Sequence, residues 1–330
     1  MDHSNDTVDL PPGLTSNLDR VVVPAHLSHD STSNTNRTDP FQFGQRILTD
    51  SDDVFEYNAW DHVEPDASHF EHCEAQYAVQ RSSPVSEFDK NRFNSSPEKW
   101  WDLFYKQKSS TFFKDRKWLF QEFPILRDIT CKGAGKQVLL EVGAGAGNTA
   151  FPIMRMNMND DLEVVAVDFS KKAVETMRNA PDSEVRLGKF RADVWDAAGK
   201  DLPLGVLEGS VDVLTMIFVF SALSPSQWAQ CVHNIKRLLR PGGYVLFRDY
   251  GRGDLAQVRF KAGRWMDENF YVRGDGTRVY FSDKDELQKL WGEHFNILDL
   301  AVDRRLIVNR QRRIKMYRCW IQGRFQKVSN

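Results

Sequence analysis

The chain has 330 residues, of which 41% are hydrophobic and 27% charged, and its formal net charge at pH 7 is −2. This length allows one large domain, or a core of about 200 residues with additions, and the composition is that of a folded protein rather than a disordered or fibrous one. Apolar runs fall well short of the roughly 20 residues that a membrane-spanning helix needs, so no membrane association is expected.

Charge is distributed unevenly along the chain. Residues 1–74 carry fifteen Asp and Glu against three Arg and no Lys, whereas residues 303–330 carry nine Arg and Lys against one Asp. The four cysteines lie far apart without a C-x-x-C pair, so neither a disulfide framework nor a metal site is expected. The N-terminus has neither the apolar region of a signal peptide nor the arginine-rich character of a transit peptide. We therefore expect a cytoplasmic protein with reduced thiols.

The first part of the chain is expected to be a tail followed by an extension. Residues 1–38 are polar and lack hydrophobic periodicity, which indicates a disordered tail. From Phe41 to Glu64, aromatic residues alternate with acidic ones, so this stretch should pack onto the rest of the protein. We therefore expect a helical and extended N-terminal extension over residues 39–120.

One helix is predicted within this extension because its start is well marked. Residues 83–94 indicate a short linker, and residues 96–98 (Ser-Pro-Glu) follow with a serine suited to the N-cap and a proline suited to the first helical position. The helix is expected to run to about Gln107. One of its faces carries Trp101, Phe104, Tyr105 and Lys108.

Residues 121–330 alternate between strand and helix patterns, which predicts an α/β fold with a mostly parallel sheet of about seven strands covered by helices on both faces. Residues 224–227 predict a capping-box helix start, residues 241–243 a turn, and residues 270–281 a hairpin inside an insertion near 250–282. The expected strands are 137–142, 162–168, 185–191, 211–218, 243–248, 295–302 and 311–325, and the expected helices are 148–157, 170–179, 225–239 and 283–292.

The stretch 138–149 carries the strongest functional signal, because a buried strand ends there in Gly143, Gly145 and Gly147. Glycines let the backbone approach a ligand closely, and the N-terminus of the following helix supplies unpaired N–H groups. An NAD fingerprint would need glycine or alanine where this chain has Asn148. Asp168 ends the next strand, where a carboxylate can accept hydrogen bonds from both ribose hydroxyl groups. A nucleotide-like cofactor is predicted, with a doubly wound domain that binds no cofactor as the alternative.

The glycine spacing, with Glu141 two residues before the first glycine, resembles motif I of class I S-adenosylmethionine methyltransferases. Methyltransferases often place an acid after the third strand against the adenine amino group, and Asp193 takes that position here. The resemblance implies a class I, Rossmann-like fold with S-adenosyl-L-methionine as the cofactor.

Further blocks resemble the tRNA 3-methylcytidine methyltransferase family. They are residues 101–106, 112–118, 217–222, 247–251 and 269–273, and residues 43–48 and 54–61 resemble the extension of the fungal and animal branch that acts on threonine tRNA. The resemblance implies methyl transfer to N3 of cytidine 32 in the anticodon loop, and an extension that binds tRNA and covers the cofactor. The cofactor contacts implied are Trp101, Tyr105, Gly143, Gly145, Gly147, Asp168, Asp193, Val194 and Ile217.

The chemistry of this reaction sets what the site must supply. The ring nitrogen N3 of cytosine carries a lone pair at neutral pH, so it needs no general base, and correct placement alone is worth roughly 7–11 kcal/mol in the best cases. The product is a cation, which a nearby carboxylate would stabilise. Asp249 and Asp115 are the candidates, with Arg248 and Arg116 beside them on the substrate side. Asp115 and Arg116 could equally form a surface ion pair.

Other reaction classes fit less well. Methylases of exocyclic amines carry an Asn/Asp-Pro-Pro-aromatic loop after the fourth strand, where this chain has Phe220-Ser221-Ala222-Leu223. Methylation of cytosine at carbon 5 needs a nucleophilic cysteine, typically after a proline, and no cysteine here follows a proline. A methyltransferase for a small molecule or a protein side chain, and a non-catalytic RNA-binding protein, remain open.

Basic residues could hold tRNA phosphates while an unstacked loop base enters the site. Only half of the arginines on alternating strands can face one side, so a solvated surface is the alternative. We expect a monomer that binds tRNA, and no helper protein can be named. The basic candidates are Arg304, Arg305, Arg310, Arg312, Arg313, Lys315 and Arg318, and a second set consists of Lys90, Arg92, Lys99, Lys106, Lys108, Lys114 and Lys117.

Overall fold

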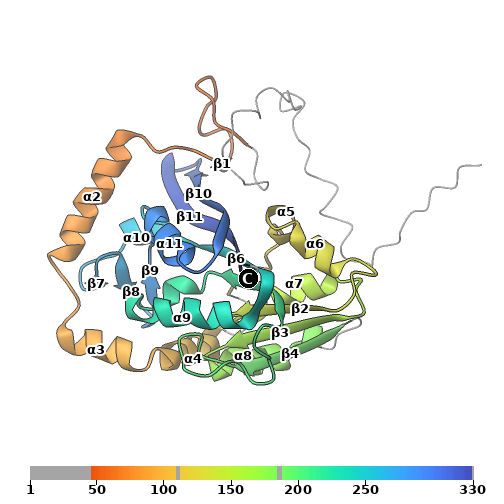
Figure 1. The fold of residues 1–330 in the computed structure, drawn as a ribbon. Coiled ribbons are helices and arrows are strands. Elements are labelled where there is room, and N and C mark those ends of the chain that lie inside the picture. Colours follow the sequence, from red (N-terminus) through yellow and green to blue (C-terminus); the bar gives the residue numbers. More distant parts are fainter. Residues whose placement is uncertain (1–45, 109–111, 184–187, 329–330) are drawn as a thin grey trace, which may run out of the picture. The chain divides into compact units, whose positions relative to one another are not determined.

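A computed structural model describes residues 46–108, 112–183 and 188–328. The predicted tail 1–38 and the aromatic residues Phe41 and Phe43 lie outside these ranges. The described residues form an eight-stranded sheet in the order β1-β10-β11-β6-β5-β2-β3-β4 (Figure 1). Its strands are β1 (Ala59–Asp61), β2 (Gln137–Val142), β3 (Leu162–Asp168), β4 (Lys189–Val194), β5 (Val211–Ile217), β6 (Leu239–Tyr250), β10 (Asn296–Asn309) and β11 (Ile314–Gln326).

The pairings confirm the predicted α/β class. Strands β4, β3, β2, β5 and β6 are mutually parallel, whereas β11, β10 and β1 continue the sheet in antiparallel fashion. The sheet has one strand more than expected because residues 59–61 pair with residues 305–307 of β10. A separate three-stranded sheet contains β7 (Trp265–Asp267), β8 (Phe270–Val272) and β9 (Arg278–Tyr280), so the predicted hairpin is confirmed.

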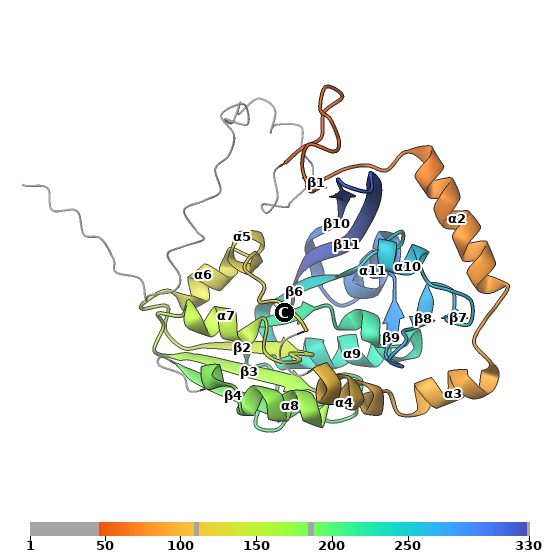
Figure 2. The same cartoon turned by 180° about the vertical axis from the view of Figure 1, so that it is seen from behind.

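Helices cover both faces of the sheet, as the alternating pattern predicts (Figures 1 and 2). The helices α5 (Leu119–Glu122), α6 (Ile125–Thr130), α7 (Ala150–Arg155) and α8 (Lys171–Arg178) share one apolar cluster with β2 and β3, whereas α9 (Pro225–Leu238) and α11 (Lys284–Gly292) share the other with β5 and β6. The predicted capping box at Ser224 and Gln227 is present. No helix within the described ranges is long and apolar enough to cross a membrane.

Several predicted boundaries are wrong. The stretch 83–94 is not a linker, because α3 (Glu87–Ser95) begins after Ser86, whose side chain accepts a hydrogen bond from the backbone N–H of Asp89. The third parallel strand lies at Lys189–Val194 rather than at 185–191, so Asp193 lies within it instead of after it. Residues 241–243 form no separate turn but belong to β6, where Gly242 adopts a φ of 75°.

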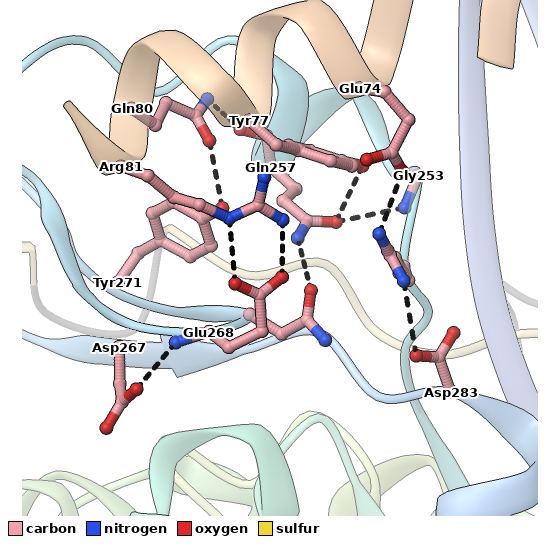
Figure 3. A network of polar contacts seen from close by, with 12 residues as sticks. Glu74, Tyr77, Gln80, Arg81, Gly253, Gln257, Asp267, Glu268, Tyr271 and Asp283 are labelled. Carbon is pink, nitrogen blue, oxygen red and sulfur yellow. Dashed lines mark hydrogen bonds and ion pairs between the residues drawn. The ribbon is translucent and has the colours of Figure 1, made fainter. Parts of the chain in front are cut away.

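The helix α2 (Ala67–Arg81) was not predicted, because a small apolar cluster of Cys73, Tyr77 and Val258 and a set of polar contacts hold it. It lies against α10 (Leu255–Val258) and the small sheet through a hydrogen-bond network (Figure 3). Tyr77 donates to the side-chain carbonyl of Gln257 at 3.0 Å, and Tyr271 donates to the side-chain carbonyl of Gln80 at 2.9 Å. The Gln80 amide donates to the backbone carbonyl of Gln257 at 3.0 Å. A buried network of this kind leaves little of the apolar periodicity from which a helix is recognised.

Candidate cofactor site

The turn after β2 leaves no room for side chains at its three glycines. Gly143, Gly145 and Gly147 have φ values of 63°, 60° and 87°, in the left-handed region that favours glycine. A β-carbon at position 143 would lie 2.1 Å from Cγ2 of Val219, and one at position 145 would lie 2.3 Å from Oη of Tyr105. The turn therefore packs directly against two walls of the cavity that it opens.

Asp168 ties the second parallel strand to this turn. Its carboxylate accepts hydrogen bonds from the backbone N–H of Gly145 and of Ser170, each at 2.9 Å. Burial raises the pKa of Asp168 to about 6, and the two backbone hydrogen bonds oppose that rise. Each oxygen still has a lone pair beyond the backbone contact, so the carboxylate can accept hydrogen bonds from a ligand in the cavity.

Glu141, the acid before the glycines, stabilises the helix that follows them. It is buried on β2 and accepts a hydrogen bond from the backbone N–H of Ala150, at the start of α7, at 2.8 Å. Burial raises the pKa of Glu141 to about 7, and the nearby Arg116 guanidinium opposes the rise. Its position at a helix N-terminus is the one in which a negative charge is favoured.

The helix α4 (Pro97–Lys108) forms one wall of the cavity. Phe104 and Tyr105 are buried together with Ala146 of the glycine turn and Ala173 of α8, as the helical face predicts. Trp101 stacks on Tyr105 with 6.1 Å between ring centroids, and both rings line the cavity. Burial raises the pKa of Tyr105 well above its usual value.

Six of the nine predicted cofactor residues line one cavity at the carboxyl ends of β2, β3 and β5: Trp101, Tyr105, Gly143, Gly145, Asp168 and Ile217. The lining does not include Gly147, Asp193 or Val194. Asp193 is ion-paired with Arg178 at 2.7 Å and with Arg191 at 2.8 Å. Asp196, which the sequence analysis missed, lines the cavity two residues after β4.

Arg116 is the predicted substrate-side residue that reaches the cavity. Its side chain makes no hydrogen bond or ion pair within the described part of the chain, and burial lowers its pKa while nearby Glu141 opposes that effect. The neighbouring Asp115 points elsewhere, because it is ion-paired with Arg155 and accepts a hydrogen bond from the Asn148 amide at 3.2 Å. The alternative of a surface ion pair therefore holds for Asp115, but with Arg155 and not with Arg116.

Arg248 and Asp249 are buried on β6 and do not belong to the lining of the cavity. Arg248 donates to Gln322 at 2.6 Å and is ion-paired with Asp303, and it lies between the rings of Trp118 and Trp320 at 5.0 Å from each centroid. These contacts fix Arg248 within the sheet and oppose the direct substrate role that we expected.

Asp249 has a comparable position. It is 1% exposed and accepts hydrogen bonds from the backbone N–H of Ser221 at 2.9 Å and of Tyr250 at 2.8 Å. Burial raises its pKa to about 6. Its carboxylate therefore holds the segment after β5, which does line the cavity through Phe218 and Val219.

Phe218 is a functional candidate that the sequence analysis missed. It adopts a φ of 58°, a conformation that costs a non-glycine residue free energy and often marks a ligand site. Its ring lines the cavity and packs against Tyr250 with 5.1 Å between centroids. The residue type did not indicate a ligand site, because the strained backbone conformation of Phe218 depends on the surrounding fold.

The seven predicted basic residues near the C-terminus divide into two groups. Arg304 is ion-paired with Glu64 at 2.8 Å, Arg305 with Asp61 at 3.3 Å, and Arg318 with Asp254 at 2.8 Å. Their charges are neutralised within the fold, so they are poor candidates for phosphate contacts. The exposed basic residues at the end of the β10–β11 ribbon are Arg310, Arg312, Arg313 and Lys315. Within the described ranges, no cluster of His, Cys, Asp and Glu is arranged to hold a metal ion.

Comparisons with known proteins agree with this geometry. Residues 140–245 match the model of a methyltransferase domain. The chain is 49% identical to the tRNA N(3)-methylcytidine methyltransferase trm140 of Schizosaccharomyces pombe, over 86% of this chain and 92% of that protein. It is 43% identical to the tRNA N(3)-methylcytidine methyltransferase Mettl2 of Drosophila melanogaster, over 88% of this chain and 90% of the relative.

A longer relative and a solved structure extend the comparison. The tRNA(Thr) (cytosine(32)-N(3))-methyltransferase of Saccharomyces cerevisiae is 49% identical over 87% of this chain, which spans 46% of that protein. The crystal structure of the PH0226 protein from Pyrococcus horikoshii OT3 matches 69% of this chain and 98% of its own, with a TM-score of 0.50 at 16% identity. At that identity the structural match bears on the fold alone.

Proposed function

Because the chain belongs to the tRNA N(3)-methylcytidine methyltransferase family, we propose that it methylates N3 of a cytidine in tRNA, with S-adenosylmethionine as the methyl donor. The observation that carries the proposal is the cavity at the carboxyl ends of β2, β3 and β5, where a glycine turn, a buried acid and two aromatic rings meet. In open α/β sheets this edge is where ligands bind.

The residues present fit the donor. Asp168 presents lone pairs suited to the ribose hydroxyl groups, and Gly143 and Gly145 contribute to the lining of the same cavity. Trp101 and Tyr105 provide apolar surface for the remainder of the molecule, while Arg116 adds cationic donors at the same cavity. When bound, S-adenosylmethionine supplies an electrophilic methyl group on a sulfonium centre.

The protein's contribution to the reaction is placement. Cytosine N3 attacks through its own lone pair, so the mechanism needs no side chain to remove a proton before attack. The walls formed by α4 and by Phe218 and Val219 would exclude water and orient the base toward the donor. Asp249 would hold the segment after β5 in place, and Arg116 would contact the substrate.

We further propose cytidine 32 of threonine tRNA as the target. Support comes from the activity for which the Saccharomyces cerevisiae relative is named and from the resemblance of residues 54–61 to the threonine-tRNA branch. These residues pack onto the sheet, since Trp60 is buried with Leu306 and Val308. A cytoplasmic location, a monomeric state and a tRNA-binding role of residues 39–120 stay predictions.

The test compares two transcripts with the purified full-length protein and methyl-labelled S-adenosylmethionine. We expect label in unmodified threonine tRNA, a primer-extension stop at position 32, and no label when cytidine 32 is replaced by uridine. Equal labelling of the uridine transcript would move the target elsewhere. Labelling of small-molecule acceptors in the absence of any labelling of tRNA would contradict the proposed function.

A further inference from the structure

Asp102, on α4, connects the wall of the cofactor cavity to the helix behind it. One oxygen of its carboxylate accepts hydrogen bonds from the Ser170 hydroxyl at 2.6 Å and from the backbone N–H of Lys172 at 3.0 Å. Ser170 is the N-cap of α8, and Lys172 belongs to the first turn of that helix. The charge of Asp102 is thus placed at a helix N-terminus, where the unpaired N–H groups stabilise it.

The same contact leads on to the acid of the cofactor site. Ser170 donates its backbone N–H to Asp168 at 2.9 Å, and Asp168 accepts the N–H of Gly145 at 2.9 Å. The hydroxyl oxygen of Ser170 also accepts the N–H of Ala173 at 3.1 Å, which leaves its proton for Asp102. A continuous chain of hydrogen bonds therefore runs from α4 through the start of α8 to the glycine turn.

A surface ion pair is the competing explanation for Asp102, and its surroundings oppose it. Lys99, Lys106 and Lys171 line the same groove between α4 and α8. In the described part of the chain, none of these three lysines forms an ion pair with Asp102. The carboxylate instead binds the end of α8.

We propose that Asp102 is a positioning residue for the methyl donor, which holds α4 against the cavity and fixes the orientation of Asp168 through Ser170. The inference rests on the proposed function insofar as it takes S-adenosylmethionine as the ligand of the cavity. On the inner side of α4, Trp101 and Tyr105 line the cavity. On the outer side, Asp102 supplies the polar attachment that keeps those rings in place.

A positioning role of Asp102 predicts a pH dependence that packing alone would not produce. The groups that face Asp168 are Asp102 and Tyr105 from α4, Glu141 from β2, and the two backbone N–H groups already described. Burial raises the pKa of Asp168 to about 6, and the negative charge of Asp102 adds to the rise. A donor site that needs ionised Asp168 therefore loses affinity as the pH falls through about 6, and removal of the Asp102 charge moves this loss to lower pH.

The test is calorimetric titration of full-length protein with S-adenosylmethionine between pH 5.5 and 8. Asp102→Asn keeps an oxygen that can accept both hydrogen bonds, so we expect nearly unchanged donor affinity at pH 8. The loss of donor affinity at acid pH (the acid limb of the affinity profile) should be displaced to lower pH. Asp102→Ala loses the attachment and should weaken donor binding by about ten-fold at pH 8, as the loss of one to two hydrogen bonds implies. With saturating donor, the KM for tRNA and kcat should change little.

The control is Asp89→Asn on α3, where a surface aspartate likewise accepts a hydrogen bond from the N-cap serine, Ser86, at 2.9 Å but lies outside the cavity lining. It should leave donor binding unchanged at all pH values. Wild-type affinity in Asp102→Ala would overturn the proposal, as would an acid limb of Asp102→Asn that coincides with that of the wild type. If Asp102→Ala does not fold, the asparagine variant still decides. Because donor binding is measured without tRNA, this test can fail or succeed independently of the methylation assay that tests the proposed function.

Discussion

The hydroxyl oxygen of Tyr105 lies so close to the backbone of Gly145 that a β-carbon at position 145 would stand 2.3 Å from it. The tyrosine comes from α4 and the glycine from the turn after β2. Two segments distant in the sequence thus close one wall of the cavity without space for a methyl group. The glycine is needed for its φ of 60° and also for the absence of a side chain.

Gly145→Ala should therefore weaken donor binding by at least about ten-fold, through displacement of Tyr105 or of the turn. Gly135→Ala is the matched control, because Gly135 has a φ of 75° and nothing within 4 Å of the position of its β-carbon. Both variants carry the backbone strain of about 1–2 kcal/mol, which urea unfolding measures. Calorimetry with S-adenosylmethionine should separate them, and equal affinities would show that the contact with Tyr105 has no role in the site.

The two predicted acids, Asp168 and Asp193, should behave differently when truncated. Asp168→Ala is expected to abolish measurable donor binding in a protein that stays folded, because the buried carboxylate lines the cavity. Asp193→Ala should weaken binding much less, since that side chain is ion-paired with Arg178 and Arg191. Calorimetry combined with circular dichroism checks both. A larger loss of donor affinity in Asp193→Ala than in Asp168→Ala would contradict this prediction and support a contact between Asp193 and the adenine of the donor.

The buried Glu141 should make the stability of the fold depend on pH. Its pKa is raised from 4.5 to about 7 in the folded protein, so ionisation costs free energy of folding as the pH rises from 4.5 to 7, and the full cost remains above 7. Glu141→Gln keeps an acceptor for the N–H of Ala150 and removes the charge. The variant should be more stable than the wild type at pH 8, by on the order of 3 kcal/mol, and the difference should vanish below about pH 4.5.

Urea unfolding at a series of pH values measures this difference. Glu175→Gln, at an exposed position on α8, is the control and should change the free energy of unfolding by less than about 0.5 kcal/mol. A stability difference for Glu141→Gln that does not depend on pH would show that the glutamate is not held with a raised pKa.

The catalytic core could be predicted from the sequence because its signals are local. The strands 137–142 and 162–168, the glycine turn and Asp168 follow from an apolar run and the residues directly after it, and the structure has all of them. The third strand was predicted too early because apolar residues already occur at positions 185 and 187, and the prediction therefore placed Asp193 after the strand instead of within it. Asp196 was missed for the same reason.

Contacts between distant segments could not be predicted, and two of them join the acidic first part of the chain to the basic last part. Glu64 and Asp61 belong to the acidic first part, and they pair with Arg304 and Arg305 of the basic last part. These pairs form because β1 lies antiparallel to β10. The sequence shows the two charged regions but not the strand pairing that brings them together.

The basic residues that have no ion-pair partner in the described part of the chain are the candidates for contacts with tRNA phosphates. Arg312 and Lys315 are exposed at the end of the β10–β11 ribbon and form no ion pair within the described ranges. The double variant Arg312→Ala with Lys315→Ala should raise the KM for tRNA several-fold and leave donor affinity unchanged. It should also reduce the slope of log affinity against log salt by about one for each phosphate that the protein no longer binds.

Arg304→Ala is the matched control for that variant, because the same residue type on the same ribbon is neutralised by Glu64. It should change the salt dependence of tRNA binding by much less, and any loss should appear in the free energy of unfolding instead. Filter binding of threonine tRNA across a salt series measures both variants. If Arg304→Ala reduced the salt dependence as much as the double variant, phosphate contacts would involve the whole ribbon. An ion pair within the protein would then not prevent an arginine from binding tRNA.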